Sequence, residues 1–248
     1  MDKKNCNIQL AQKFNVESFE NNFSEDFYAV PNIIGRNILI LKDKKTTKMM
    51  LPNYIIGIDE KNNFFLTDEK GNESKDIKNI TNQCVATKVS AIIQDGSRRF
   101  IDCRFDDLIC ILSEIHHFFM TDIGFQGKIV YNTYNENFWF LIYDLFTLEE
   151  FNSKKGITPY NDRRDLLNIM SVHHTFINVS IAPVFYNGNN LKACDINFEK
   201  FNNLMDKADF NIKNNGYLIY NKNANYIFGQ TEKVLIVSKG EGNNNGIH

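Results

Sequence analysis

One carboxylate in this sequence has surroundings that require a chemical explanation. Asp144 interrupts Phe140–Phe146 (FLIYDLF), a run with the composition of a strand that is buried on both faces. A buried carboxylate is costly unless it is hydrogen-bonded or paired. We expect its partner to be a backbone N–H group or an arginine of the helix that follows, where Arg163 and Arg164 are adjacent.

Histidine and cysteine, two common metal-binding residue types, are not spaced as a metal site requires. The five cysteines contain no C-x-x-C pair, and the histidines are His116-His117, His173-His174 and His248. Adjacent side chains point to different faces of a helix or strand. We therefore predict that the chain has no metal site.

The aromatic residues before Asp144 could support another kind of chemistry, the stacking of a base. Trp139 is the only tryptophan, and a ring of this kind can stack on a cap guanine or on a single-stranded base. Alternation along the strand puts Trp139, Leu141 and Tyr143 on one face, but both faces are apolar. We therefore predict that Trp139 is a core residue.

Short strands and turns must position these residues. Asp95-Gly96 predicts a hairpin turn between strands at Cys84–Ile93 and Arg99–Arg104. Asp106 can cap a helix that runs to about Phe119. Further helices are expected over Ile8–Phe23, from Asn161 onward and over Asn197–Ala208, and further strands over Asn37–Leu41, Tyr54–Ile58, Asn63–Thr67, Gly124–Tyr131, Asn137–Phe146, Asn178–Phe185, Gly216–Tyr220 and Val234–Ser238. Because strands and hairpins dominate, the predicted fold class is α+β, with antiparallel sheets and packed helices.

Composition narrows the class of protein. The chain has 248 residues, and its hydrophobic content of 43% is sufficient for a folded core. A net charge of −2 lacks the basic surplus of a domain that binds duplex DNA. No segment resembles a signal peptide or a membrane span, so we expect a reducing compartment, cytoplasmic or nuclear. We expect N-terminal strands and a helix packed on the core over 1–83, the core over 84–239 and a flexible tail over 240–248.

Several segments, in a fixed order, resemble the nucleotidyltransferase core of mRNA capping enzymes and nucleic-acid ligases. They are GFQGKIV (124–130), FLIYDLF (140–146), a helix with RR and LL pairs (163–167), VSIAPVF (179–185), NNGYLIY (214–220), YIFGQT (226–231) and VLIVSK (234–239). The resemblance covers about Cys84–Lys239. It implies a nucleotidyltransferase-like core, and nothing in the sequence resembles the oligonucleotide-binding domain that usually follows such a core.

The chemistry implied by the resemblance depends on a lysine. In the family, the lysine of a K-x-D-G motif attacks the α-phosphate of a nucleoside triphosphate, and two carboxylates hold a metal or orient the lysine. Here the nucleophile has two placements. Lys88 begins K-V-S-A, which lacks the aspartate and glycine, whereas Ile93 begins I-Q-D-G, which lacks the lysine. We favour Asp95-Gly96 as an ordinary hairpin turn.

Most other positions of the family's chemistry are replaced. Lys128 stands where a D-G-E motif has its glutamate, and Asn215 stands where an E-G motif has its glutamate. Two lysines that would neutralise phosphate charge fall on Ile236 and Ser238. The residues that the resemblance implies for nucleotide or cap binding are Lys128, Asp144, Asn215, Lys233 and Lys239.

These losses predict a catalytically degenerate protein, comparable to the cap-binding domain of the import adaptor snurportin. We expect a binding or accessory subunit in RNA capping or transcription, with protein subunits of such an assembly or an RNA 5′ end as partners, and without cofactor, membrane or duplex DNA. A viral origin would suit so divergent a copy. The alternative is an active guanylyltransferase or RNA ligase that forms a covalent Lys88–nucleotide from GTP or ATP with Mg²⁺ or Mn²⁺. A further alternative is an unrelated α+β protein.

Overall fold

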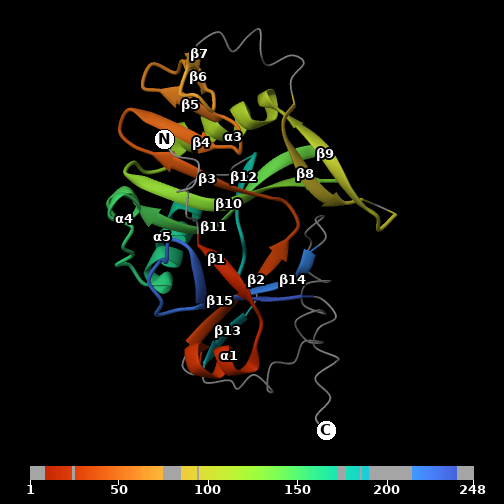
Figure 1. The fold of residues 1–248 in the computed structure, drawn as a ribbon, viewed down its shortest axis with the longest axis vertical. Coiled ribbons are helices and arrows are strands. Elements are labelled where there is room, and N and C mark those ends of the chain that lie inside the picture. The colour runs from red at the N-terminus through yellow and green to blue at the C-terminus, as the bar shows by residue number, and fades with distance from the viewer. Residues whose placement is uncertain are drawn as a thin grey trace.

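The strands of this protein form a five-stranded sheet, an eight-stranded sheet and a separate hairpin (Figure 1). The structure is a computed structural model that describes residues 9–23, 26–74, 85–93, 95–172, 177–184, 186–189 and 214–238. Within these residues the fold is rich in sheet and contains few helices. None of the helices described is long and apolar enough to cross a membrane.

The eight-stranded sheet has β10 near its centre, between β11 and β3. Its order is β12-β11-β10-β3-β4-β5-β6-β7, and every neighbouring pair is antiparallel except β11 and β12. Its strands are β3 (Arg36–Lys42), β4 (Thr46–Met50), β5 (Ile55–Asp59), β6 (Phe64–Thr67), β7 (Glu73–Ser74), β10 (Ile123–Asn132), β11 (Asn137–Thr147) and β12 (Val179–Ile181).

The five-stranded sheet joins segments from both ends of the chain, in the order β1-β15-β14-β2-β13. All of its pairs are antiparallel except β1 and β15. Its strands are β1 (Leu10–Lys13), β2 (Asp26–Ile33), β13 (Tyr186–Asn189), β14 (Asn214–Asn221) and β15 (Gln230–Val237). Strands that precede residue 84 therefore belong to both sheets: β1 and β2 to the five-stranded sheet, and β3 to β7 to the eight-stranded sheet. The expectation of antiparallel sheets holds for all but two strand pairs.

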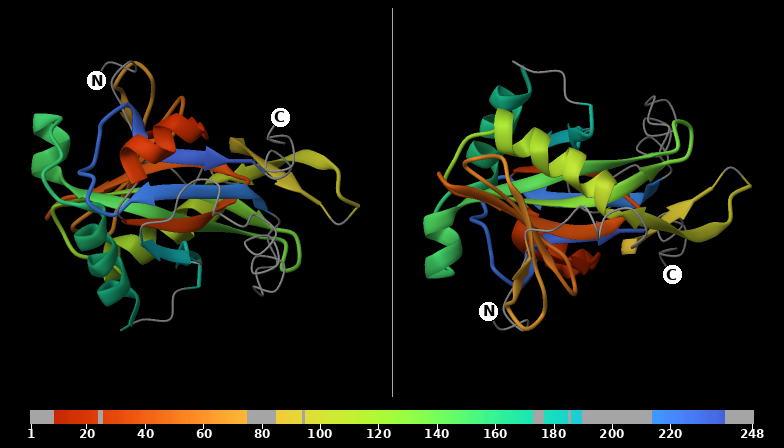
Figure 2. Two further views of the ribbon diagram at one scale, coloured as in Figure 1. Left: turned by 90° about the horizontal axis from the view of Figure 1, so that it is seen from below. Right: turned by 90° about the horizontal axis from the view of Figure 1, so that it is seen from above.

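The separate hairpin is the one that Asp95-Gly96 predicts. It pairs β8 (Val85–Ile92) with β9 (Arg98–Arg104), and it projects from one side of the molecule (Figures 1 and 2). In the turn, the Ser97 amide donates to Asp95 Oδ1 over 2.7 Å, and Gly96 has a φ of +83°, which favours glycine.

Four helices are described: α1 (Val16–Phe23), α3 (Phe105–Phe118), α4 (Leu148–Ser153) and α5 (Tyr160–Val172). The longest, α3, buries Leu108 and Leu112 against the eight-stranded sheet. The prediction that Asp106 caps this helix is wrong, because the N-cap residue is Arg104 and Asp106 lies inside the first turn. The last turn of α3 is closed by the Lys42 ammonium, which donates to the carbonyl oxygen of Phe119 over 2.6 Å. At the start of α4, the Thr147 hydroxyl accepts from the amide of Glu150, whose carboxylate accepts from the amide of Thr147.

One predicted helix is wrong over part of its length. Ile8–Phe23 was expected to be helical, but Leu10–Lys13 forms β1, and only Val16–Phe23 is helical. The backbone bonds from Leu10 N to the Gly229 carbonyl and from Phe14 N to the Ile236 carbonyl, each 2.8 Å, hold this segment against β15. Pairing with a distant strand overrides the local spacing. The expected helix at Asn197–Ala208 lies outside the described residues.

Candidate functional site

A β-bulge in β11 turns two consecutive side chains away from the core beneath α3. Across the β10–β11 pair, Gln126 lies opposite Asp144 and Gly127 lies opposite Ile142, so Tyr143 is the extra residue. Ile142 packs in the core beneath α3, whereas Tyr143 packs in a second core, which also contains residues of the five-stranded sheet. A bulge re-aims side chains in this way and is common beside functional sites.

The Tyr143 side chain fills space between the two sheets and ties them together. Its hydroxyl donates to the carbonyl oxygen of Pro31 over 2.9 Å and accepts from the Ile33 amide over 3.0 Å, so both contacts are to β2. Burial raises the pKa of this hydroxyl, which therefore stays protonated at neutral pH. Stacked rings from Tyr160 and Tyr220, with centroids 4.2 Å apart, extend the packing.

Lys128 lies beside Tyr143, and its side chain donates hydrogen bonds from β10 to β2. Its ammonium donates to Asn32 Oδ1 over 2.6 Å and to the Ile33 carbonyl oxygen over 2.9 Å. The ammonium is also 5.3 Å from the centroid of the Tyr143 ring. Burial lowers the pKa of Lys128 to about 8, because the charged form loses solvation.

Asn215 and Gly216 reach the same place from β14. In the pairing of β14 with β2, Asn214 lies opposite Ile33 and Tyr217 lies opposite Pro31, so Asn215 and Gly216 bulge across from Asn32. Gly216 has a φ of +102°, a conformation that side chains with a Cβ rarely adopt. Of the positions implied by the resemblance, Lys128 is therefore hydrogen-bonded to Asn32, and the exposed Asn215 lies across from Asn32 in the strand pairing. We call Asn32, Lys128 and Asn215 the inter-sheet cluster.

Sequence reasoning missed Asn32. The segment Asn32–Gly35 reads N-I-I-G and contains neither a lysine nor an aspartate. That glycine is required by close packing, since a Cβ on Gly35 would lie 2.5 Å from the carbonyl oxygen of Ile129. A search for a lysine or for an Asp-Gly pair does not find this segment. The available signal was a lone glycine followed directly by the apolar strand Asn37–Leu41.

Asp144 has the arginine partner that the sequence predicts. Arg163 Nε donates to Asp144 Oδ1 over 2.8 Å and Arg163 Nη2 donates to Oδ2 over 2.9 Å, and both side chains are 1% exposed. The amide of Leu145 donates to Oδ1 as well, over 2.8 Å. Burial raises the pKa of Asp144, and the guanidinium offsets part of that rise. Both carboxylate oxygens are thus engaged in holding α5 against β11.

The other predicted residues lie elsewhere. Lys88 is on β8, where its side chain is 67% exposed and its ammonium is 3.6 Å from a carboxylate oxygen of Asp102. Its neighbour Val89 is fully buried, so Lys88 points away from the core. Lys233 is partly exposed on β15, and Lys239 lies outside the described residues. Trp139 packs against the core between the sheets and remains partly exposed.

The inter-sheet cluster is a poor cation site. It offers two amides and an ammonium, whereas Mg²⁺ and Mn²⁺ favour carboxylate oxygens. The positive charge of Lys128 also repels a metal ion. Among the described residues, no three histidine, cysteine, aspartate or glutamate side chains gather as a metal site would require. The metal that a nucleotidyltransferase uses therefore does not fit the residues of this cluster.

Comparison with known proteins identifies the fold. No protein-family model and no curated protein matches the sequence. A structure called Pmar-Lig_Pre. matches with 12% identity and a TM-score of 0.57, and one called Pmar-Lig_PreS3 with 11% and 0.55. Each alignment covers 94% of this chain and 46% of the other, so the chain spans less than half of those proteins. The ATP-dependent DNA ligase of bacteriophage T7, in a complex with ATP, matches with 10% identity over 94% of this chain and 68% of its own, at a TM-score of 0.46.

The first two matches show that the chain has a ligase-like fold. At this level of identity, likeness extends to the fold alone. Activity must therefore be argued from the side chains of the inter-sheet cluster.

Proposed function

We propose that this chain is a catalytically degenerate nucleotidyltransferase-like protein that acts as a binding or accessory subunit in RNA capping or transcription. It would hold an RNA 5′ end, a cap or a protein subunit of such an assembly. The observation that carries the proposal is the 2.6 Å hydrogen bond from Lys128 to Asn32. Lys128 occupies the position that the resemblance gives to a carboxylate, and its partner Asn32 is an uncharged amide.

The chemistry of nucleotidyl transfer has no support at this position. The reaction needs a neutral amine directed at the α-phosphate and a metal that neutralises the developing charge. The amine present, on Lys128, instead donates to two oxygens of β2. A nucleotide also needs open volume, whereas Tyr143 and its neighbours fill the space between the sheets.

A labelling experiment tests the loss of activity. Purified protein is incubated with α-labelled GTP or ATP and Mg²⁺ or Mn²⁺, denatured, and separated by electrophoresis. The wild type, Lys88→Ala and Lys128→Ala are compared. We expect no covalent label in any of them. A label that survives denaturation would refute the degenerate assignment, and the variant that loses it would identify the nucleophile.

The second candidate is an active nucleotidyltransferase. One observation favours Lys128 over Lys88 for that role: burial lowers the pKa of Lys128 to about 8, which raises the fraction of neutral amine near physiological pH. This candidate predicts a label that is lost in Lys128→Ala and kept in Lys88→Ala. The cofactors GTP or ATP with Mg²⁺ or Mn²⁺ belong to this candidate only.

The binding role has its own measurement. Fluorescence anisotropy compares short RNAs of one sequence that end in a 5′ cap, a 5′ triphosphate or a 5′ hydroxyl. If the chain holds an RNA end, affinity differs among the three. Equal or absent binding would refute recognition of RNA ends and leave the protein-subunit role.

A further inference from the structure

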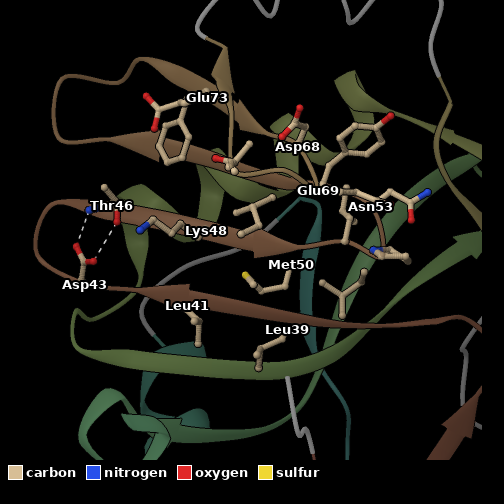
Figure 3. Close-up of a pocket in the computed structure, with 18 of the residues that line it drawn as sticks. Leu39, Leu41, Asp43, Thr46, Lys48, Met50, Asn53, Asp68, Glu69 and Glu73 are labelled. Atoms are coloured by element: carbon tan, nitrogen blue, oxygen red, sulfur yellow. Dashed lines mark hydrogen bonds between the residues drawn. The ribbon is translucent and has the colours of Figure 1, made fainter. Parts of the chain in front are cut away.

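The eight-stranded sheet bears a groove that the inter-sheet cluster does not line. The groove has a volume of about 960 Å³ and runs over β3, β4, β5 and β6, with α4 as one wall (Figure 3). Neither Asn32 nor Lys128 nor Tyr143 is among its lining residues. It is therefore a separate surface, and its chemistry can be considered independently of nucleotidyl transfer.

The floor of the groove is apolar. Leu41 and Met50 face it and are only partly buried, and Phe151 contributes from α4. The ring of Phe65 lies over Gly57 of the neighbouring strand β5. Only glycine leaves room for it there, since a Cβ on Gly57 would be 2.0 Å from the Phe65 Cζ atom. Partly exposed apolar side chains gathered in a concavity are typical of a surface that binds another molecule.

The charged residues that line the groove are nearly all acidic. One cation, Lys48, stands against five carboxylates, which belong to Asp43, Asp59, Asp68, Glu69 and Glu73. The lysines of the same turns do not line the groove; these are Lys44, Lys45, Lys61 and Lys70. This charge balance disfavours a phosphate backbone, which needs cations, and favours a cationic partner.

Turn structure keeps two of these carboxylates, those of Asp43 and Asp68, charged and in place. Asp43 Oδ1 accepts from the amides of Lys45 and Thr46, each over 2.7 Å, and Asp68 Oδ1 accepts from the amide of Asn72 over 2.8 Å. Although burial opposes it, these hydrogen bonds hold the pKa of Asp43 below its usual value, and bonds from Asn72 lower the pKa of Asp68. A carboxylate has about four acceptor sites, so capping a turn leaves capacity for a cation.

The dimensions of the groove suit a helix. The three gaps between β3 and β6 span about 14 Å at the usual spacing of about 4.8 Å between strands. Along β4, a strand of five residues extends about 17 Å. An α-helix is about 10–12 Å wide with its side chains, and about 11 of its residues cover 17 Å.

We infer that this groove binds a basic amphipathic helix of a partner protein. The apolar face of that helix would lie on the floor, and its lysines or arginines would lie against the carboxylates that line the groove. This mode of recognition lays the apolar stripe of a helix into a hydrophobic groove. The inference rests on the protein-binding part of the proposed role, for which it specifies the partner class, and not on the loss of catalysis. It does not depend on the inter-sheet cluster, so a positive labelling experiment would leave it standing.

The test uses a labelled helical peptide of leucine and lysine, about 11 residues long to match the groove. Its controls are a leucine–glutamate peptide and an oligouridylate. Binding to the full chain is measured by fluorescence anisotropy and by NMR of ¹³C-labelled methionine methyl groups. Met50 lines the groove, whereas Met120, which is exposed and does not line it, is the internal control. We expect the leucine–lysine peptide to bind and to shift the Met50 signal alone.

Matched charge reversals distinguish binding in the groove from attraction of the peptide to the net charge of the protein. The double variant Glu69→Lys and Glu73→Lys should bind the leucine–lysine peptide with about tenfold lower affinity, since each reversal removes an attraction and adds a repulsion. Glu136→Lys with Asp165→Lys makes the same change in net charge at exposed positions outside the groove, and we expect less than about a twofold effect.

Three results would overturn the inference. Equal weakening by both variant pairs would show attraction to net charge. An unshifted Met50 signal at saturating peptide would place binding elsewhere. A Met50 shift caused by oligouridylate or by the leucine–glutamate peptide would assign the groove to another class of ligand.

Discussion

The charge state of Lys128 makes a quantitative prediction about stability. Its pKa is about 8 in the folded protein, against 10.5 in the unfolded chain. Between these values the unfolded chain binds more protons, so stability rises as pH rises from about 8 to 10.5 and is lost as pH falls through 8. A shift of this size corresponds to about 3 kcal/mol, at about 1.4 kcal/mol per pKa unit.

The perturbation is Lys128→Met, which keeps the length and apolar stem of the side chain and removes the charge. The variant loses the hydrogen bonds to Asn32 and Ile33, a cost of about 1–3 kcal/mol at any pH, but it also escapes the burial of an ammonium. Its deficit relative to the wild type should therefore be small near pH 7 and grow by about 3 kcal/mol towards pH 10.5. Lys42, whose pKa burial also lowers to about 8, is present in both proteins and cancels from the difference.

The assay is urea unfolding followed by fluorescence of Trp139, the only tryptophan, at several pH values. The control is Lys61→Met, which removes an exposed lysine from a turn and should leave the pH dependence unchanged. A difference between wild type and Lys128→Met that stays constant across this range, within about 0.5 kcal/mol, would refute the burial of a charged lysine at this position.

Three further perturbations address the packing around the site. Arg163→Met should cost about 3–5 kcal/mol in urea unfolding because the buried Asp144 carboxyl loses its ion-pair partner, and the added change Asp144→Leu should recover most of that loss; a double variant as unstable as Arg163→Met would contradict this account. Tyr143→Phe should cost about 1–3 kcal/mol by calorimetry, since two backbone groups of β2 lose their partner, and a neutral result would argue against the hydroxyl bridge. Gly35→Ala should lower the melting temperature and reduce stability by about 1–3 kcal/mol, because the new methyl group meets the Ile129 carbonyl. An unchanged melting temperature would show that the segment around Gly35 can move away from β10 at no cost.

Local pattern was sufficient to predict the strand that holds Asp144 and the partner of its carboxylate. A long apolar run excludes water, so a charge within it must be paired, and the two arginines of the next helix were the nearest candidates. The structure confirms Arg163 in this role. The hairpin at Asp95-Gly96 was predictable for a similar reason, because its turn chemistry is contained in adjacent residues.

The inter-sheet cluster depends on strand order, which alternation of side chains does not encode. Asn32 and Lys128 are 96 positions apart and meet only because β2 and β10 face each other from different sheets. The family motif gave no help at this place, since Asn32–Gly35 (N-I-I-G) contains neither the lysine nor the Asp-Gly pair by which K-x-D-G is found. The lysine that the motif did offer, Lys88, has an exposed side chain on a separate hairpin.

The acidic groove was hidden from the sequence for a related reason. Its carboxylates lie in or beside the turns that follow β3, β5 and β6, where charged residues are ordinarily solvated. Nothing local distinguishes the carboxylates that line the groove from the lysines of the same turns that do not. The register of four strands brings them to one face.

The arrangement of the five-stranded sheet has a consequence for how the chain folds. β2 precedes every strand of the eight-stranded sheet in the chain, whereas its partner β14 follows all of them. The eight-stranded sheet has all its strands once β12 has emerged, whereas β2 must wait with an unpaired backbone edge. Pairing between residues so distant in sequence is slow, because the entropy of closing the intervening chain must be overcome first. The arrival of β14 and β15 therefore completes the five-stranded sheet, and a chain that lacks them presents β2 as an open edge on which aggregation can start.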